Sequence, residues 1–202
     1  VMKEHGVPDW YIWSCKKIKY MFPKAHAAAY VMMAWRVAYC KVFYPLAYYC
    51  AYFSIRANAF DYEKMAMGQD KLKYFINDYR KRRAESPTGK LSNTEEDELK
   101  DMRIVEEMYA RGFDFTPIDI YKAKARSFQV IDGKIMPSFK VIDKVGEVAG
   151  ESIEIAASNG KFLSKDDLRQ RAKVGQTVID KLTDIGLLNG MAQSNQLSLF
   201  DF

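Results

Sequence analysis

The sequence predicts a mainly α-helical protein with one small β-hairpin. Apolar and amphipathic stretches of helical length fill its first half, Gly residues separate shorter helical patterns in its second half, and one Asp-Gly dipeptide lies between two short apolar runs. Of its 202 residues, 49% are hydrophobic and 28% are charged, a balance typical of globular proteins. At this length the chain forms one or two domains.

The first half predicts four helices. The earliest begins at Pro8-Asp9, and the next spans about 25–44, where Pro45 ends it because proline lacks an amide donor. Residues 25–44 are apolar nearly all round, so we expect this helix to be buried on several sides. The remaining two helices are expected at about 46–57, which is rich in aromatic residues, and at about 62–83, which is amphipathic and basic.

A domain boundary is expected within residues 84–94, where Pro, Gly, Ser and Asn gather. Directly after it, Ser92 and Glu95 have the spacing of a capping box, which predicts the start of the next helix. Gly112 is placed to end that helix.

Beyond residue 113 the pattern changes to short elements. Asp132-Gly133 favours a two-residue type I′ turn, so the runs on either side are predicted to pair as a β-hairpin. Three short helices separated by Gly residues are expected to follow, at about 141–159, 164–171 and 175–182.

Composition excludes several classes of protein. The three cysteines, Cys15, Cys40 and Cys50, are too few for a disulfide framework, and their odd number fits a reducing, cytoplasmic location. With two His and no paired cysteines, no metal site is expected. The longest uncharged apolar run covers residues 27–35, whereas a bilayer span needs about 20 residues, so no membrane contact is expected. The start at Val1, without a signal peptide, suggests a piece of a longer chain.

Charge is distributed unevenly along the chain. Residues 1–90 hold 16 Lys and Arg against 7 Asp and Glu, a net charge of +9, whereas the remainder holds 15 against 19, a net charge of −4. The basic half is a candidate for phosphate contact, although a solvated basic surface explains the charge equally well.

A Val-Gly pair precedes a helix at two places, Val145-Gly146 and Val174-Gly175, as in the core of a helix-hairpin-helix. Such a bend can direct backbone N–H groups at the start of a helix toward a phosphate, without reading base sequence. The alternative is a pair of helical hairpins that only change the chain's direction. The candidate DNA-binding residues are Lys144, Val145, Gly146, Glu147, Val148, Gly175 and Gln176.

Two further segments have functional and structural interpretations. Lys24 and His26 open the apolar helix and Arg36 follows, so the helix either faces a triphosphate or is a core helix whose cations reach solvent. Near the end, 196–200 (QLSLF) is either a docking peptide for an apolar pocket or a frayed tail.

The segment 20–30 (YMFPKAHAAAY), followed by Arg36, Lys41 and Tyr44-Pro45, resembles the fingers of C-family bacterial replicative polymerases. It is more similar to the PolC-type DNA polymerase III alpha subunit than to the DnaE type. The hairpin, the first Val-Gly bend, 160–168 (GKFLSKDDL) and 196–200 follow in the order of that family's C-terminus.

This resemblance implies three regions. Residues 1–84 would be the C-terminal part of the fingers, with Lys24, His26 and Arg36 near the incoming dNTP. Residues 85–190 would form a duplex-binding domain with tandem helix-hairpin-helix elements. Residues 191–202 would be a tail that binds the sliding clamp (the beta subunit) through Gln196, Leu199 and Phe200.

The family's reaction is template-directed nucleotidyl transfer onto a primer–template duplex, with Mg²⁺ held by palm aspartates. Those aspartates lie upstream in the family, so this chain alone is expected to be inactive as a polymerase. Asp143-Lys144 stands where the family usually has Pro-Gly, which leaves open which amides of the first bend face DNA. The alternative function is a free-standing helix-hairpin-helix module that binds DNA or protein.

Overall fold

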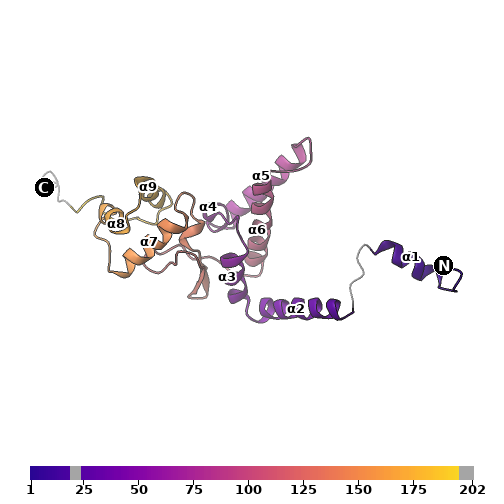
Figure 1. The fold of residues 1–202 in the computed structure, drawn as a ribbon. Helices are drawn as coiled ribbons and strands as arrows, with labels where there is room; N and C mark the ends of the chain where they lie inside the picture. Colours follow the sequence, from indigo (N-terminus) through magenta and orange to yellow (C-terminus); the bar gives the residue numbers. More distant parts are fainter. Residues whose placement is uncertain (19–23, 196–202) are drawn as a thin grey trace. The chain divides into compact units, whose positions relative to one another are not determined.

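A computed structural model describes residues 1–18 and 24–195 of the chain (Figure 1). It is mainly helical with one two-stranded antiparallel sheet, which confirms the predicted fold class. The chain divides into two compact units, Val1–Phe43 and Tyr44–Phe202. In order, the elements are α1 (Asp9–Lys17), α2 (Lys24–Phe43), α3 (Pro45–Ile55), α4 (Tyr62–Met65), α5 (Gln69–Glu85), α6 (Asn93–Ala110), β1 (Gln129–Ile131), β2 (Lys134–Met136), the 3₁₀ helix η1 (Phe139–Val141), α7 (Gly146–Ser158), α8 (Lys165–Ala172) and α9 (Gln176–Asp184).

The described part of the first unit consists of α1, α2 and the turn before α1, and neither helix buries a residue within it. The expectation that the helix at 25–44 is buried on several sides is therefore wrong for this chain. Burial requires neighbouring elements, and large side chains such as Tyr30 and Trp35 stay exposed here. No helix among the described residues is both long and apolar enough to cross a membrane.

The helix expected at 62–83 is instead two helices. Asp61 caps α4 by accepting a hydrogen bond from the backbone amide of Lys64 at 2.9 Å. Helix α4 ends at Met65. Gly68, the N-cap of α5, has a φ of 107°, which lies outside the region that L-residues readily adopt, and α5 begins at the next residue. A glycine inside an amphipathic pattern thus separates two elements that share a buried face.

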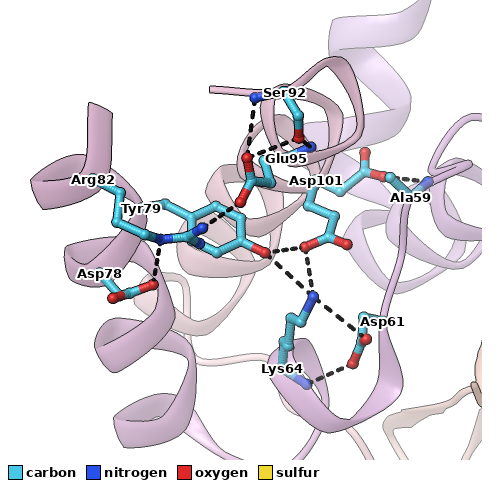
Figure 2. A network of polar contacts seen from close by, with 10 residues as sticks. Ala59, Asp61, Lys64, Asp78, Tyr79, Arg82, Ser92, Glu95 and Asp101 are labelled. Carbon is cyan, nitrogen blue, oxygen red and sulfur yellow. Dashed lines mark hydrogen bonds and ion pairs between the residues drawn. The ribbon is translucent and has the colours of Figure 1, made fainter. Parts of the chain in front are cut away.

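Helices α5 and α6 pack in one unit, so the loop at 84–94 joins two packed helices (Figure 1). Polar contacts join α4, α5 and α6, where Lys64 and Tyr79 both donate hydrogen bonds to Glu98. Figure 2 shows this network from close by. The Lys64 ammonium lies 2.7 Å from the Glu98 carboxylate. Arg82 of α5 pairs with Glu95, which also forms the predicted capping box with Ser92 and so confirms the start of α6.

A buried carboxyl lies at the edge of this network. Asp101 is 5% exposed and accepts a hydrogen bond from the backbone amide of Ala59 at 3.1 Å (Figure 2). Burial raises the pKa of Asp101 to about 6, the Ala59 amide opposes that rise, and the nearby Asp97 adds to it. The carboxyl therefore fixes the loop before α4 at an electrostatic cost.

An aromatic cluster forms the centre of the second unit. The Phe53 ring lies 5.2 Å from Phe60 and 5.6 Å from both Phe115 and Phe128, measured between ring centroids. These residues come from α3, from the loop before α4 and from the segment between α6 and β1, so the cluster joins distant parts of the sequence.

The predicted β-hairpin is confirmed. Val130 pairs with Ile135, and the turn residues Asp132 and Gly133 have φ values of 49° and 74°, as a type I′ turn requires. The three expected helices after it are present as α7, α8 and α9, with Ser164 capping α8 by accepting from the Asp167 amide at 3.1 Å. The first of them begins at Gly146 and is shorter than expected, because residues 139–141 form the separate helix η1 and residues 143–145 form a turn.

Candidate nucleic-acid interface

Two bends, residues 143–146 before α7 and residues 173–175 between α8 and α9, form the candidate interface. Each is anchored by its valine. Val145 is 4% exposed and its amide donates to the Ile142 carbonyl at 3.2 Å, while Val174 is 8% exposed and donates to the Arg169 carbonyl at 3.2 Å. Since the valines point into the core, the residues that follow them must remain at the surface.

The first bend leaves backbone donors unused. Gly146, Glu147 and Val148 are exposed, and their amides have no hydrogen-bond partner within residues 1–18 and 24–195. They form the first turn of α7, where helical N–H groups lack intrahelical acceptors and the helix dipole places partial positive charge. The bend therefore presents a group of donors suited to an anion.

The second bend presents a similar group. Gly175, Gln176 and Thr177 are exposed, and no described residue accepts a hydrogen bond from their amides. Inside the helix, the Val178 amide is already bonded to the Gly175 carbonyl at 3.1 Å. Both bends thus face outward with their first amides available.

The backbones of the two bends share one feature and differ in another. Lys144 and Lys173 both adopt left-handed conformations, with φ of 64° and 52°. Gly146 has a φ of 65°, whereas Gly175 is extended, with φ −72° and ψ 163°. Lys144 therefore takes a conformation that a glycine adopts at less cost, which keeps the turn despite the departure from Pro-Gly.

Acidic residues near the first bend are balanced by one arginine. Arg126 contacts the carboxylates of Glu147 at 2.7 Å and Glu151 at 2.6 Å. These two acids flank the exposed start of α7 and would repel a phosphate. Pairing with Arg126 reduces that repulsion, although all three side chains remain largely exposed to solvent.

The candidate nucleotide-binding residues Lys24, His26 and Arg36 all lie on α2 but do not gather on one face. At 100° per residue, His26 and Arg36 point about 200° and 120° away from Lys24 around the helix axis. His26 packs against Tyr30 with ring centroids 4.4 Å apart. Arg36 lines a shallow apolar hollow with Val31, Met32 and Trp35.

Two other expectations concern the sliding clamp and a metal ion. Gln196, Leu199 and Phe200, the expected clamp-binding residues, lie outside the described residues. Within the described ranges, no three His, Cys, Asp or Glu side chains gather as a metal would require. The acids of the α6 and α8 starts act instead as caps, as Glu95 and Asp167 show.

Two residues of the interface escaped the sequence analysis. Arg126 is 21 positions from Glu147, so only the packed fold brings them together. Lys173 had a local signal, because the tripeptide Lys-Val-Gly occurs both at 144–146 and at 173–175. That repetition places a lysine at the same position of each bend.

Comparisons with known proteins agree with this geometry. A family model described as "Helix-hairpin-helix motif" matches residues 112–197, which include both bends. The chain is 48% identical over 200 residues to the "DNA polymerase III PolC-type" of Streptococcus sanguinis (strain SK36), and 49% identical over 201 residues to that of Streptococcus mutans serotype c (strain ATCC 700610 / UA159). Each alignment covers 99% of this chain.

The chain spans only 13 to 14% of the length of these relatives. It is therefore homologous to one segment of PolC-type DNA polymerases III, which confirms the resemblance that the sequence motifs indicated. The match to the helix-hairpin-helix model likewise confirms the expected architecture around the two Val-Gly pairs.

Proposed function

We propose that this chain is the C-terminal part of the fingers and the duplex-binding region of a PolC-type replicative DNA polymerase, and that its two bends hold the sugar-phosphate backbone of the primer–template duplex. The exposed, unused amides of both bends carry this proposal. Their position inside the helix-hairpin-helix match supports it.

The bends suit a partner with regularly spaced anions. Free N–H groups at a helix start bind phosphate oxygens without contacting bases, so the grip is independent of sequence. A polymerase needs this property, because it must hold every sequence that it copies. In this proposal Gly146, Glu147, Val148, Gly175 and Gln176 offer free amides to the duplex. Lys144 lies beside them, and Val145 anchors the first bend in the core, since its own amide is bonded to the Ile142 carbonyl.

The remaining proposed roles rest on the resemblance of the sequence to the polymerase family. Lys24, His26 and Arg36 of α2 would lie near the incoming dNTP. Because they point to different sides of the helix, other parts of the enzyme would have to complete the triphosphate site around one or more of them. Gln196, Leu199 and Phe200 would dock on the sliding clamp. Mg²⁺ would be held by palm aspartates elsewhere in the parent chain, which would act in the bacterial cytoplasm.

A single-atom test of the bend is available at Gln176, the first residue of α9. Proline is tolerated at the first helical position and lacks the N–H group, and Gly175 already has the extended conformation that proline requires of its predecessor. Gln176→Pro therefore deletes one donor. Gln176→Ala is the matched control, since it keeps the amide but removes the side chain, which donates to Asp180 at 2.8 Å.

The measurement is the affinity of the 202-residue chain for a fluorescent DNA duplex at fixed salt. A hydrogen bond to a charged group is worth about 1.5–3 kcal/mol, so Gln176→Pro should weaken binding by about ten-fold or more. Gln176→Ala should bind like the parent. Equal affinities for the two variants, both folded by circular dichroism, would reject the amide contact.

A further inference from the structure

Cationic side chains in the helix-hairpin-helix region divide into two groups. Between residues 112 and 142 every Lys and Arg is engaged: for example, Lys124 pairs with Glu154 at 3.0 Å and Lys140 donates to the Ser54 carbonyl at 2.8 Å. The other engaged cations of that stretch are Lys122, Arg126 and Lys134. The stretch that contains the two bends differs.

From residue 143 to residue 173, Arg171 is the one cation whose side chain forms an ion pair with a described residue. The side chains of the others form no hydrogen bond or ion pair within the described ranges. These are Lys144, Lys161, Lys165, Arg169 and Lys173. Unpaired cations are therefore concentrated around the bends.

Three of these cations form a stripe on α8. Lys165, Arg169 and Lys173 are spaced at i, i+4 and i+8, which places the first two on one helix face and the third at the C-cap that continues it. Arg169 and Lys173 line the same open hollow. We call these three residues the α8 stripe, and at 1.5 Å per residue it is about 12 Å long.

The acids of α8 do little to neutralise the stripe. Asp167 is occupied, because it accepts from the Leu163 amide at 3.0 Å and pairs with Arg171 at 3.4 Å. Asp166 does line the hollow, where it accepts from the Gln193 side chain at 3.4 Å. The hollow thus holds two cations against one acid, and a net positive charge remains.

The stripe ends at the second bend. Lys173 is directly followed by Val174 and then by Gly175 and Gln176, whose amides are unused. One strand of duplex DNA places a phosphate about every 3.4 Å along the helix axis, so a stripe of about 12 Å spans about four phosphates and can contact three of them. Side-chain charge and backbone donors therefore lie along one continuous surface.

We propose that Lys165, Arg169 and Lys173 form a side-chain track that contacts three phosphates of one DNA strand, continuous with the donors of the second bend. The inference rests on the proposed function, since it extends duplex binding from backbone amides to these three side chains. Lys173 has a left-handed backbone, which glycine would adopt at less cost. A phosphate contact made by its charged side chain explains why a lysine stands at this position of the bend.

The test measures how the affinity of the 202-residue chain for a DNA duplex falls with NaCl concentration. Each phosphate contact contributes about 0.9 to the slope of log affinity against log salt. The triple variant Lys165→Gln, Arg169→Gln, Lys173→Gln should therefore lower that slope by about 2 to 3. The charge-conserving triple Lys165→Arg, Arg169→Lys, Lys173→Arg should retain it.

A matched control separates the stripe from net charge. Lys73, Arg80 and Lys90 are exposed cations outside the helix-hairpin-helix region, and their side chains form no ion pair with described residues. Replacing all three by Gln removes the same charge and should leave the slope within about one unit of the parent's. An equal loss in this control would overturn the proposal, because it would show a general charge effect.

Lys173→Gly provides a second variant that does not depend on the triple variant folding. It relieves the left-handed backbone and should raise the melting temperature, yet it should lower the salt slope by about one contact, or about 0.9. A parent chain that does not bind duplex DNA would refute the proposed function itself. A parent that binds, with triple and Lys173→Gly variants of unchanged slope, would refute the α8 stripe alone.

Discussion

The two bend glycines should respond in opposite directions to the same substitution, serine. Gly146 has a φ of 65°, where an L-residue costs about 1–2 kcal/mol relative to glycine. Gly175 has φ −72° and ψ 163°, which serine adopts freely. A Cβ added at either position would have no neighbouring atom within 4 Å, so steric contact does not enter and backbone conformation alone decides.

At Gly175 the substitution should be neutral or favourable. This residue is the N-cap of α9, and serine exceeds glycine at N-caps by a few tenths of a kcal/mol. Replacing glycine also reduces the entropy of the unfolded chain, worth about 0.4–1 kcal/mol. The free energy of unfolding of Gly175→Ser should therefore exceed that of Gly146→Ser by about 2 kcal/mol.

Thermal denaturation followed by circular dichroism provides the assay. For a domain of about 150 residues, 1 kcal/mol corresponds to about 2–4 °C, so the melting temperatures of the two variants should differ by about 4–8 °C. Equal melting temperatures, or a less stable Gly175→Ser, would refute the assignment of different backbone conformations to the two bends.

Three further predictions concern the second unit. In the folded chain the pKa of Asp101 is raised to about 6 from 3.8. Between about pH 4 and about pH 6 the folded state therefore binds more protons at this carboxyl than the unfolded state does. The free energy of unfolding should fall as pH rises from about 4 to about 6. Asp101→Asn should abolish that slope in urea titrations at several pH values; an unchanged slope would contradict it. Glu98→Ala should cost about 2–3 kcal/mol, because it removes the acceptor that the half-buried Lys64 and Tyr79 share and leaves Lys64 only the longer contact with Asp61. Lys100→Ala removes an exposed pair worth less than about 0.5 kcal/mol, so equal costs in denaturant would disprove this. Gly150→Ala places a Cβ 2.9 Å from a side chain of η1, so a cost of about 1 kcal/mol is expected despite better helix propensity, and a higher denaturation midpoint would count against it.

Local chemistry explains which elements the sequence could predict. The hairpin turn at Asp132-Gly133, the capping box of Ser92 with Glu95 and the Ser164 cap each depend on a few adjacent residues, and all three are present in the fold. The positions of both bends followed equally from their Val-Gly pairs, because a buried valine and a turn glycine act within one short segment.

Features that depend on distant residues could not be predicted in this way. The aromatic cluster around Phe53 joins residues more than 70 positions apart, and the pairing of Arg126 with Glu147 exists only once α7 has packed. The predicted burial of α2 was wrong for a related reason. The sequence shows that the helix is apolar, but it does not show whether another element packs against it. Gly68 could have indicated the break between α4 and α5, but the helical pattern on both sides of it predicted one continuous helix.

The candidate site shows the same division. The residues of the bends could be predicted, and the structure adds that their amides are unused and that Lys144 takes the left-handed conformation of the missing glycine. The sequence could not predict that the cations of the α8 stripe are unpaired, because that depends on where every neighbouring acid lies in the fold. The three cations expected near a nucleotide share a helix but not a face, so a common ligand would need groups from elsewhere in the parent chain.

The most direct test of the central claim follows the backbone amides themselves. In ¹H–¹⁵N spectra of the ¹⁵N-labelled chain, titration with a short DNA duplex should shift the amide signals of Gly146, Glu147, Gly175 and Gln176 most strongly, and should do so for duplexes of unrelated sequence. If these four signals stay in place while others move, the duplex is held by a different surface and the proposed role of the two bends is wrong.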